Sequence, residues 1–222
     1  MKTTIEGGQA FSYIDIELEP NESIMTESDA MSSMDANLDL QAMFNGGLIK
    51  GLLRKFLGGE TLFISKFTNN SDGNSQLKLV QPTPGDIKQI NLNEGEVFYL
   101  QPGTYLASTT HIKLGLKWAG LVSFIAREGL FKIAVSGPGT VFYGAYGALL
   151  EKEIDGEYII DTSHLVAYEP GIELKLQLAG GIFSSFFGGE GLVTRVNGKG
   201  KVIIQSRSLS GLGSWLNPKF WN

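Results

Sequence analysis

The sequence contains no cysteine, which excludes disulfides and thiolate chemistry. No apolar run approaches the roughly 18 residues of a membrane-spanning helix, and the first residues, MKTTIEGGQAFSYIDIE, lack the apolar core of a signal peptide. We therefore expect a cytoplasmic protein, and the lack of cysteine is compatible with that reducing compartment. The formal net charge is −5, and an acidic chain lacks the field that attracts polyanions. Nucleic acid is thus disfavoured as a partner.

Recognisable catalytic motifs are also missing. The chain has no Gly-x-Ser-x-Gly elbow, and its glycine-rich segments do not have the spacing of phosphate-binding loops. Its two histidines, His111 and His164, stand alone, without the neighbouring ligands that a cupin-like metal site needs. We therefore expect a non-enzymatic protein with no cofactor and no metal. The alternative is a small-molecule-binding or catalytic protein that uses a β-helix cavity, with these histidines as the imidazole candidates.

Strand signals dominate what is present. Ile14, Ile16 and Leu18 alternate with acidic residues, which is the period of a half-buried strand. Glycine is abundant, at 29 residues, and turn signals recur about every ten positions. Among them, Asp155-Gly156 and Asn197-Gly198 favour tight hairpins, because these residue pairs tolerate positive φ. The pattern predicts an all-β fold with little helix, and residues 48–56 are the one helix candidate.

A threefold plan underlies this pattern. Gly47, Gly120 and Gly181 each begin an apolar stretch, at offsets of 73 and 61 positions, and an upstream turn repeats at the same two offsets. We expect one domain, residues 1–222, built from internal repeats at about 11–82, 90–147 and 151–208 and ending in an aromatic tail, 209–222. Packed about a pseudo-threefold axis, such repeats would form a barrel-like double-stranded β-helix.

Several segments carry a family resemblance. The GG-apolar-GGE segments, residues 127–147 (REGLFKIAVSGPGTVFYGAYG) and the late VNGKGKVIIQSRS resemble a bacterial family of unassigned function that includes a mitochondrial protein named for altered inheritance of mitochondria. The resemblance implies a double-stranded β-helix related to the tryptophan RNA-binding attenuation protein. It also implies a homo-oligomer, with a trimer favoured, and a part in inner-membrane organisation for the mitochondrial relative. It assigns no catalytic residue.

The candidate interaction residues lie in three glycine-bounded apolar loops and in the tail. They are Leu48, Leu52, Leu53 and Phe56 in the first loop, Phe124 and Ile125 in the second, Phe183, Phe186 and Phe187 in the third, and Trp215 and Trp221 in the tail. The loops could fill the core, form an oligomer interface or contact a membrane surface. Lys50, Arg54 and Lys55 favour membrane contact for the first loop. The tail aromatics are expected to dock across a subunit interface.

Recurring carboxylates give a weaker signal. Glu60, Glu128 and Glu190 recur at one repeat position, and we interpret them as surface ion-pairing groups rather than as a cation-binding ring. The function predicted from the sequence is therefore a scaffold or interaction protein that self-associates and is peripheral to a membrane where its loops are exposed. Cavity-based binding or catalysis is the second hypothesis, and RNA binding is the third.

Overall fold

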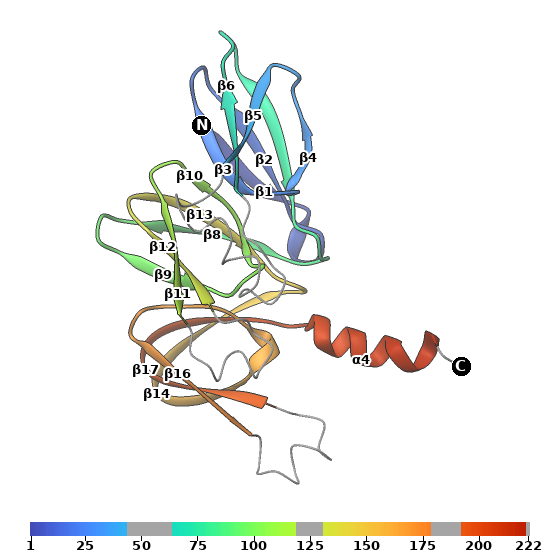
Figure 1. The fold of residues 1–222 in the computed structure, drawn as a ribbon, viewed down its shortest axis with the longest axis vertical. Coiled ribbons are helices and arrows are strands. Elements are labelled where there is room, and N and C mark those ends of the chain that lie inside the picture. The colour runs from blue at the N-terminus through green and yellow to red at the C-terminus, as the bar shows by residue number, and fades with distance from the viewer. Residues whose placement is uncertain (44–63, 119–130, 179–191, 221–222) are drawn as a thin grey trace.

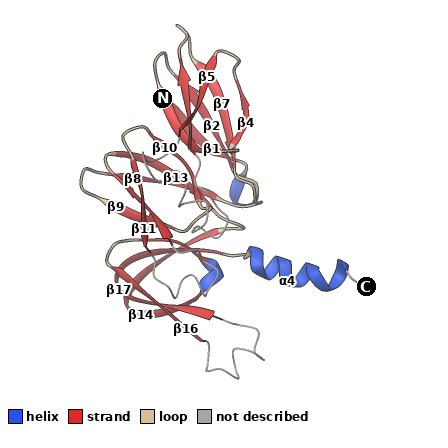
Figure 2. Cartoon of the chain, in the orientation of Figure 1, coloured by secondary structure: helices blue, strands red, loops and turns tan. Residues whose placement is uncertain are grey.

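The protein is mostly β in the computed structural model, which describes residues 1–43, 64–118, 131–178 and 192–220. Its strand pairs are antiparallel, and the described strands form three sheets. Within the described residues, one α-helix, α4 (Leu209–Phe220), follows the last strand, and two short 3-10 helices, η1 (Gly8–Ala10) and η2 (Thr162–His164), lie between strands (Figure 2). The structure confirms the expectation of a β-class fold with little helix.

The three sheets differ in size. The first has the order β1 (Lys2–Glu6), β2 (Tyr13–Leu18), β7 (Ser75–Val80), β4 (Met31–Met34). The second has the order β5 (Leu38–Met43), β6 (Ile64–Asn69), β3 (Ser23–Glu27), β10 (Tyr105–Thr109), β13 (Gly139–Gly144), β8 (Ile87–Leu92). The third has the order β11 (Lys113–Trp118), β12 (Phe131–Ser136), β9 (Val97–Leu100), β15 (Leu165–Tyr168), β17 (Leu192–Gln205), β14 (Leu149–Asp161), and β16 (Ile172–Leu178) also pairs with β17.

Apolar alternation explains why these segments form strands. In β2 the side chains of Ile14, Ile16 and Leu18 are fully buried, whereas the residues between them are half-buried. Strand β2 therefore places one face against the core and the other toward its surface, which is the arrangement that a period of two produces. The strand predicted from this alternation is confirmed.

The same pairing pattern occurs in three successive groups of strands. Group one is β2–β7, in which β7 lies between β2 and β4, and β6 lies between β3 and β5. Group two is β8–β13, in which β13 lies between β8 and β10, and β12 lies between β9 and β11. Group three is β14–β17, in which the long strand β17 lies between β14 and β15 and, nearer its start, between β14 and β16.

Strand pairs also join neighbouring groups. β3 of group one pairs with β10 of group two, and β9 of group two pairs with β15 of group three. The three groups of strands follow one another along the longest axis of the molecule (Figure 1). This arrangement does not by itself establish the pseudo-threefold axis expected from the sequence.

Two predicted hairpin turns are instead part of continuous strands. Asp155-Gly156 lies inside β14 and Asn197-Gly198 lies inside β17, where Gly156 and Gly198 are register partners with φ of 108° and 128°. A Cβ at Gly198 would stand 2.1 Å from the carbonyl oxygen of Gly171. The glycines therefore let two paired strands change conformation together, and the prediction of tight hairpins here is wrong.

Side chains from all three groups fill the core. The buried apolar residues form three clusters, each made mainly of residues from one group. In the cluster of group two the rings of Phe98 and Tyr143 lie 6.0 Å apart. Burial raises the pKa of Tyr105, whose hydroxyl shares a 2.9 Å hydrogen bond with Ser108. The core of the described residues is therefore apolar, with its few polar groups paired inside it.

Helix α4 was not expected from the sequence, which indicated only an aromatic tail there. Ser208 caps it, because its Oγ accepts a hydrogen bond from the backbone N–H of Gly211 at 3.0 Å. The predicted helix at residues 48–56 lies outside the described residues.

A buried asparagine fixes the corner between β6 and β7. The Asn69 amide donates to the carbonyl oxygens of Leu18 (2.9 Å) and Gly73 (2.7 Å). Its Oδ1 accepts hydrogen bonds from the Ser71 backbone N–H (3.0 Å) and from the hydroxyls of Ser71 (2.7 Å) and Ser75 (3.1 Å). With every donor and acceptor used and no exposed surface, this side chain connects two sheets.

We predict that Asn69→Ala lowers the free energy of unfolding by about 1–3 kcal/mol or more, because it leaves buried partners unsatisfied. Urea denaturation followed by circular dichroism measures the change. Asn70→Ala is the matched control, since Asn70 is exposed, and it should change stability by less than about 0.5 kcal/mol. Equal losses for the two variants would contradict the assigned role of Asn69.

Candidate interaction surfaces

Most of the interaction residues predicted from the sequence lie outside the described residues. These are Leu48, Leu52, Leu53, Phe56, Phe124, Ile125, Phe183, Phe186, Phe187 and Trp221, and the recurring Glu60, Glu128 and Glu190 lie there too. Trp215 is described, and its side chain is 62% exposed on helix α4. The tail is therefore the predicted surface whose geometry can be followed.

Helix α4 extends away from the body of the molecule and contains no buried residue (Figure 1). At 3.6 residues per turn, Leu209, Leu212, Leu216 and Phe220 lie on one side of the helix, and Trp215 lies beside Leu212. Leu209, Trp215 and Phe220 are the most exposed of this set, at 59%, 62% and 72%. The helix presents a continuous apolar stripe to solvent.

The composition of α4 gives this helix little stability of its own. Gly211 and Gly213 lower its helix propensity, and Pro218 removes one backbone donor from its interior. A 12-residue helix is marginal in water even with favourable residues. The side chain of Lys219, whose Nζ lies 4.6 Å from the ring centroid of Trp215, covers only part of one aromatic residue. A partner that buries the stripe would stabilise the helix.

Two strand edges also expose apolar side chains. All four residues of β4 are exposed, with Met31 and Met34 each at 37%. On β14, Tyr158 and Ile159 are 42% and 52% exposed. Each strand ends its sheet, so one row of its backbone groups faces away from the sheet.

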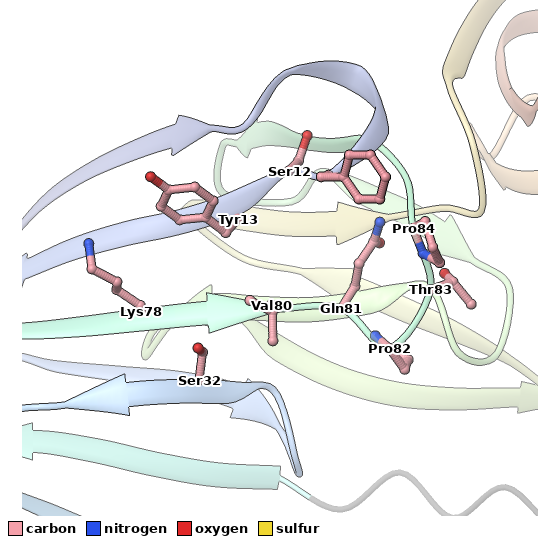
Figure 3. A pocket seen from close by; sticks show the side chains of 10 residues that line it. Ser12, Tyr13, Ser32, Lys78, Val80, Gln81, Pro82, Thr83 and Pro84 are labelled. Atoms are coloured by element: carbon pink, nitrogen blue, oxygen red, sulfur yellow. The ribbon is translucent and has the colours of Figure 1, made fainter.

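A pocket of about 490 Å³ lies beside the first sheet (Figure 3). Lys78 and Tyr13 stand at one end of its lining and Gln81 at the other (Figure 3). Lys78 forms an ion pair with Asp15, and its Nζ lies 5.6 Å from the ring centroid of Tyr13. The pocket can hold a small polar molecule, but Lys78, the cation in its lining, is already paired with Asp15. Its lining is Phe11, Ser12, Tyr13, Ser32, Lys78, Val80, Gln81, Pro82, Thr83 and Pro84.

The two histidines occupy separate places. His111 is exposed at the turn between β10 and β11, whereas His164 belongs to η2. The Nδ1 atom of His164 lies 2.6 Å from the carbonyl oxygen of Gln205, and since a carbonyl only accepts, this nitrogen carries the proton. His164 therefore holds η2 against the end of β17. No group of three His, Asp or Glu side chains suited to a metal ion occurs among the described residues.

A lysine and aromatic cluster was missed by sequence reasoning. The Nζ of Lys132 lies 3.9 Å from the ring centroid of Tyr99 and 5.0 Å from that of Tyr168, and these two rings are 5.3 Å apart. Burial, with a smaller contribution from nearby Lys117, lowers the pKa of Lys132. The rings already cover this amine, so the cluster joins three strands rather than forming an open reactive site. No local motif marks it, because its members are distant in the sequence.

An ion-pair cluster connects groups two and three. Glu151 on β14 accepts from Lys88 on β8 at 3.0 Å and pairs with Lys201 on β17 at 3.2 Å. Hydrogen bonds from Lys88 and Lys201 lower the pKa of Glu151. Since the folded pKa is the lower one, this carboxylate stabilises the fold above its unfolded pKa, and that stabilisation is lost as the pH falls through the folded value.

We predict that Glu151→Gln flattens the acid side of the stability profile. The side chain is 41% exposed, so the loss near neutral pH should be small, about 0.2–1 kcal/mol, and should shrink further at about pH 3. Urea denaturation across this pH range measures it. Glu173→Gln, at an exposed site on β16, serves as control, and a pH profile identical to that of wild type for Glu151→Gln would refute the assignment.

The described residues contain no helix of the length and apolarity needed to cross a membrane. Two comparisons with other proteins bear on the whole chain. The chain is 29% identical over 218 residues to the uncharacterised protein M6_Spy0233 of Streptococcus pyogenes serotype M6, which covers 94% of this chain and 87% of that protein.

The fold resembles the crystal structure of protein SPYM3_0169 from Streptococcus pyogenes. The TM-score is 0.79 at 27% sequence identity, over 98% of this chain and 99% of the other. These matches place the chain among bacterial relatives of unassigned function and do not establish the expected likeness to the attenuation protein. A family described as mitochondrial biogenesis AIM24 matches residues 3–207, nearly the whole chain, and the protein belongs to this family.

Proposed function

We propose that this protein is a non-enzymatic scaffold that self-associates in the cytoplasm. The observation that carries the proposal is helix α4, which leaves the body of the molecule with its apolar stripe exposed. Burying a side chain such as Trp215 or Phe220 contributes about 1.5–3 kcal/mol each, so the stripe can supply a large part of a binding free energy.

A second copy of the chain is the proposed partner for this helix. The same chain exposes apolar side chains elsewhere, among them Leu40 (44%) and Met43 (42%) on β5 and Leu150 (53%) on β14. A copy therefore offers apolar surface that also gains from being covered. The family description names mitochondrial biogenesis, yet the relatives reported above are bacterial, so the shared property must be one that does not need the organelle.

The three groups of strands are, in this proposal, three internal repeats. Their common order of pairings supports this interpretation, as does the spacing of glycines in the sequence. A chain made of similar units suits a scaffold, because each unit presents comparable surfaces at regular intervals.

Small-molecule binding is the second candidate, and the pocket beside the first sheet favours it. It ranks lower because the ion pair with Asp15 already neutralises Lys78. Contact with a membrane surface, through α4 or the apolar loops, is the remaining alternative for the exposed apolar residues.

We predict that Trp215→Glu/Phe220→Glu weakens self-association by at least tenfold, because each substitution removes an apolar contact and adds a charge. Analytical ultracentrifugation over a concentration series measures the dissociation constant. Asn217→Glu is the matched control on the polar side of the same helix and should leave the constant within about twofold of wild type.

Two results would overturn the proposal. A wild-type protein that stays monomeric at all concentrations would exclude self-association. Flotation of wild type, but not of the Trp215→Glu/Phe220→Glu variant, with anionic phospholipid vesicles would assign the helix to a membrane surface instead. Unchanged association of the double variant would show that α4 is not the contact.

A further inference from the structure

Strands β4, β10 and β15 occupy the same place in their groups. Each pairs with the last strand of its group, and each pairing has a register shift at the same point: between Met31 and Ser33, between Tyr105 and Ala107, and between Leu165 and Ala167. A bulge that recurs at one position in three strands shows that the residues on either side of it correspond. Ser33 thus corresponds to Ala107 and Ala167, and Met34 to Ser108 and Tyr168.

These three strands differ in what lies along their second edge, the edge that does not pair with the last strand of their own group. β10 pairs there with β3 of the preceding group, and β15 pairs there with β9 of the preceding group. β4 belongs to the first group, and within the described residues β7 is its only strand partner. The burial follows this difference: every residue of β15 is buried and only the last of β10 is not, whereas every residue of β4 is exposed.

In group three, at the other end of the chain, a strand edge also lacks a partner among the described residues. β3 and β9 each give their second edge to the next group, and the corresponding stretch of group three is residues 157–161 of β14. In the described part of the chain this stretch pairs only with β17. By its pairing, Tyr158 corresponds to Ile24 and Phe98, which are 0% and 2% exposed, but Tyr158 is 42% exposed.

These two edges cannot meet within one molecule. β4 lies at one end of the longest axis and β14 at the other (Figure 1). We propose that β4 of one copy pairs with residues 157–161 of β14 in a second copy, so that copies join head to tail through the same contact that joins successive groups. This inference rests on the self-association proposed above and adds a second contact between copies to the one made by helix α4.

The contacts between groups fix the expected register. Ala107 lies opposite Thr26 and Ser108 opposite Met25, and in the next contact Ala167 lies opposite Leu100 and Tyr168 opposite Tyr99. Carried to the two free edges, the same register places Ser33 opposite Ile160 and Met34 opposite Ile159. The pairing is antiparallel, and it buries Met34 and Ile159 against each other.

Such a contact joins two different surfaces of one chain, so it is heterologous. Heterologous contacts close into a ring when the rotation between copies allows it and otherwise continue as a filament. A second copy is the occupant that fits best, because each free edge matches the strand that already pairs with its counterparts in the chain. An unrelated strand would satisfy the backbone groups but would have no reason to keep this register.

Cysteine pairing gives a direct test, because the natural chain has no cysteine. Met34→Cys and Ile159→Cys are prepared as separate proteins, mixed and oxidised. Directly opposed residues have Cα atoms about 4.5–5.5 Å apart, within the range of a disulfide. We expect the mixture to form a covalent dimer at least tenfold faster than either protein alone.

The matched control pairs Thr4→Cys with Ile159→Cys. Thr4 is exposed on β1, at the opposite edge of the sheet that contains β4. A rate for Met34→Cys with Ile159→Cys that does not exceed this control would overturn the proposal.

A charge pair provides the second test. Met34→Glu and Ile159→Lys should each weaken association at least tenfold, and the protein carrying both should recover most of the loss, because opposite charges then face each other across the contact. Thr4→Glu, at an exposed site on β1, is the control, and an unchanged melting temperature for each variant shows that the fold is intact.

The outcomes separate this inference from the function on which it rests. If wild type associates and neither charged variant changes its dissociation constant, the edge contact is wrong and self-association stands. If wild type is monomeric at every concentration and no cross-link exceeds the control, both fail.

Discussion

The structure depends on strands that pair on both edges. In each group the strand before the corner and the strand after it lie between two partners, and β3 and β9 then extend their sheets into the following group. Backbone donors and acceptors are satisfied wherever a neighbour is present, and the apolar side chains of the paired strands are buried in the same step. Pairing between groups is therefore also what completes the core.

This constraint explains where the protein exposes apolar surface. A linear series of similar groups has a first member without a predecessor and a last member without a successor. The exposed Met34 on β4 and the exposed Ile159 on β14 occur at these two places. Inside the series the counterparts of Met34, which are Ser108 and Tyr168, are buried, and the counterparts of Ile159, which are Met25 and Tyr99, are half-buried. Helix α4 adds a third apolar surface that the described strands do not bury. Together these features are the observations on which the proposal of self-association depends.

Three polar side chains hold distant parts of the described structure together. Asn69 hydrogen-bonds to backbone groups at the corner between β6 and β7, and Glu151 joins groups two and three by pairing with lysines. His164 holds the short helix η2 to the last strand. Lys132 is the described lysine whose pKa is lowered, and two tyrosine rings cover it. These clusters draw on residues far apart in the sequence, so no local motif could have indicated them.

The sequence by itself determined that the chain is built mainly from strands, because apolar alternation acts over a few residues, as Ile14, Ile16 and Leu18 show. It could not determine which strands pair, since pairing joins residues distant in the chain; Asp155-Gly156 has the residues of a hairpin turn and lies inside a continuous strand. It also left α4 as an aromatic tail, because glycine and proline conceal its helical period. Which apolar residues remain exposed was decided only by tertiary structure, because exposure depends on whether a neighbouring group is there to cover them.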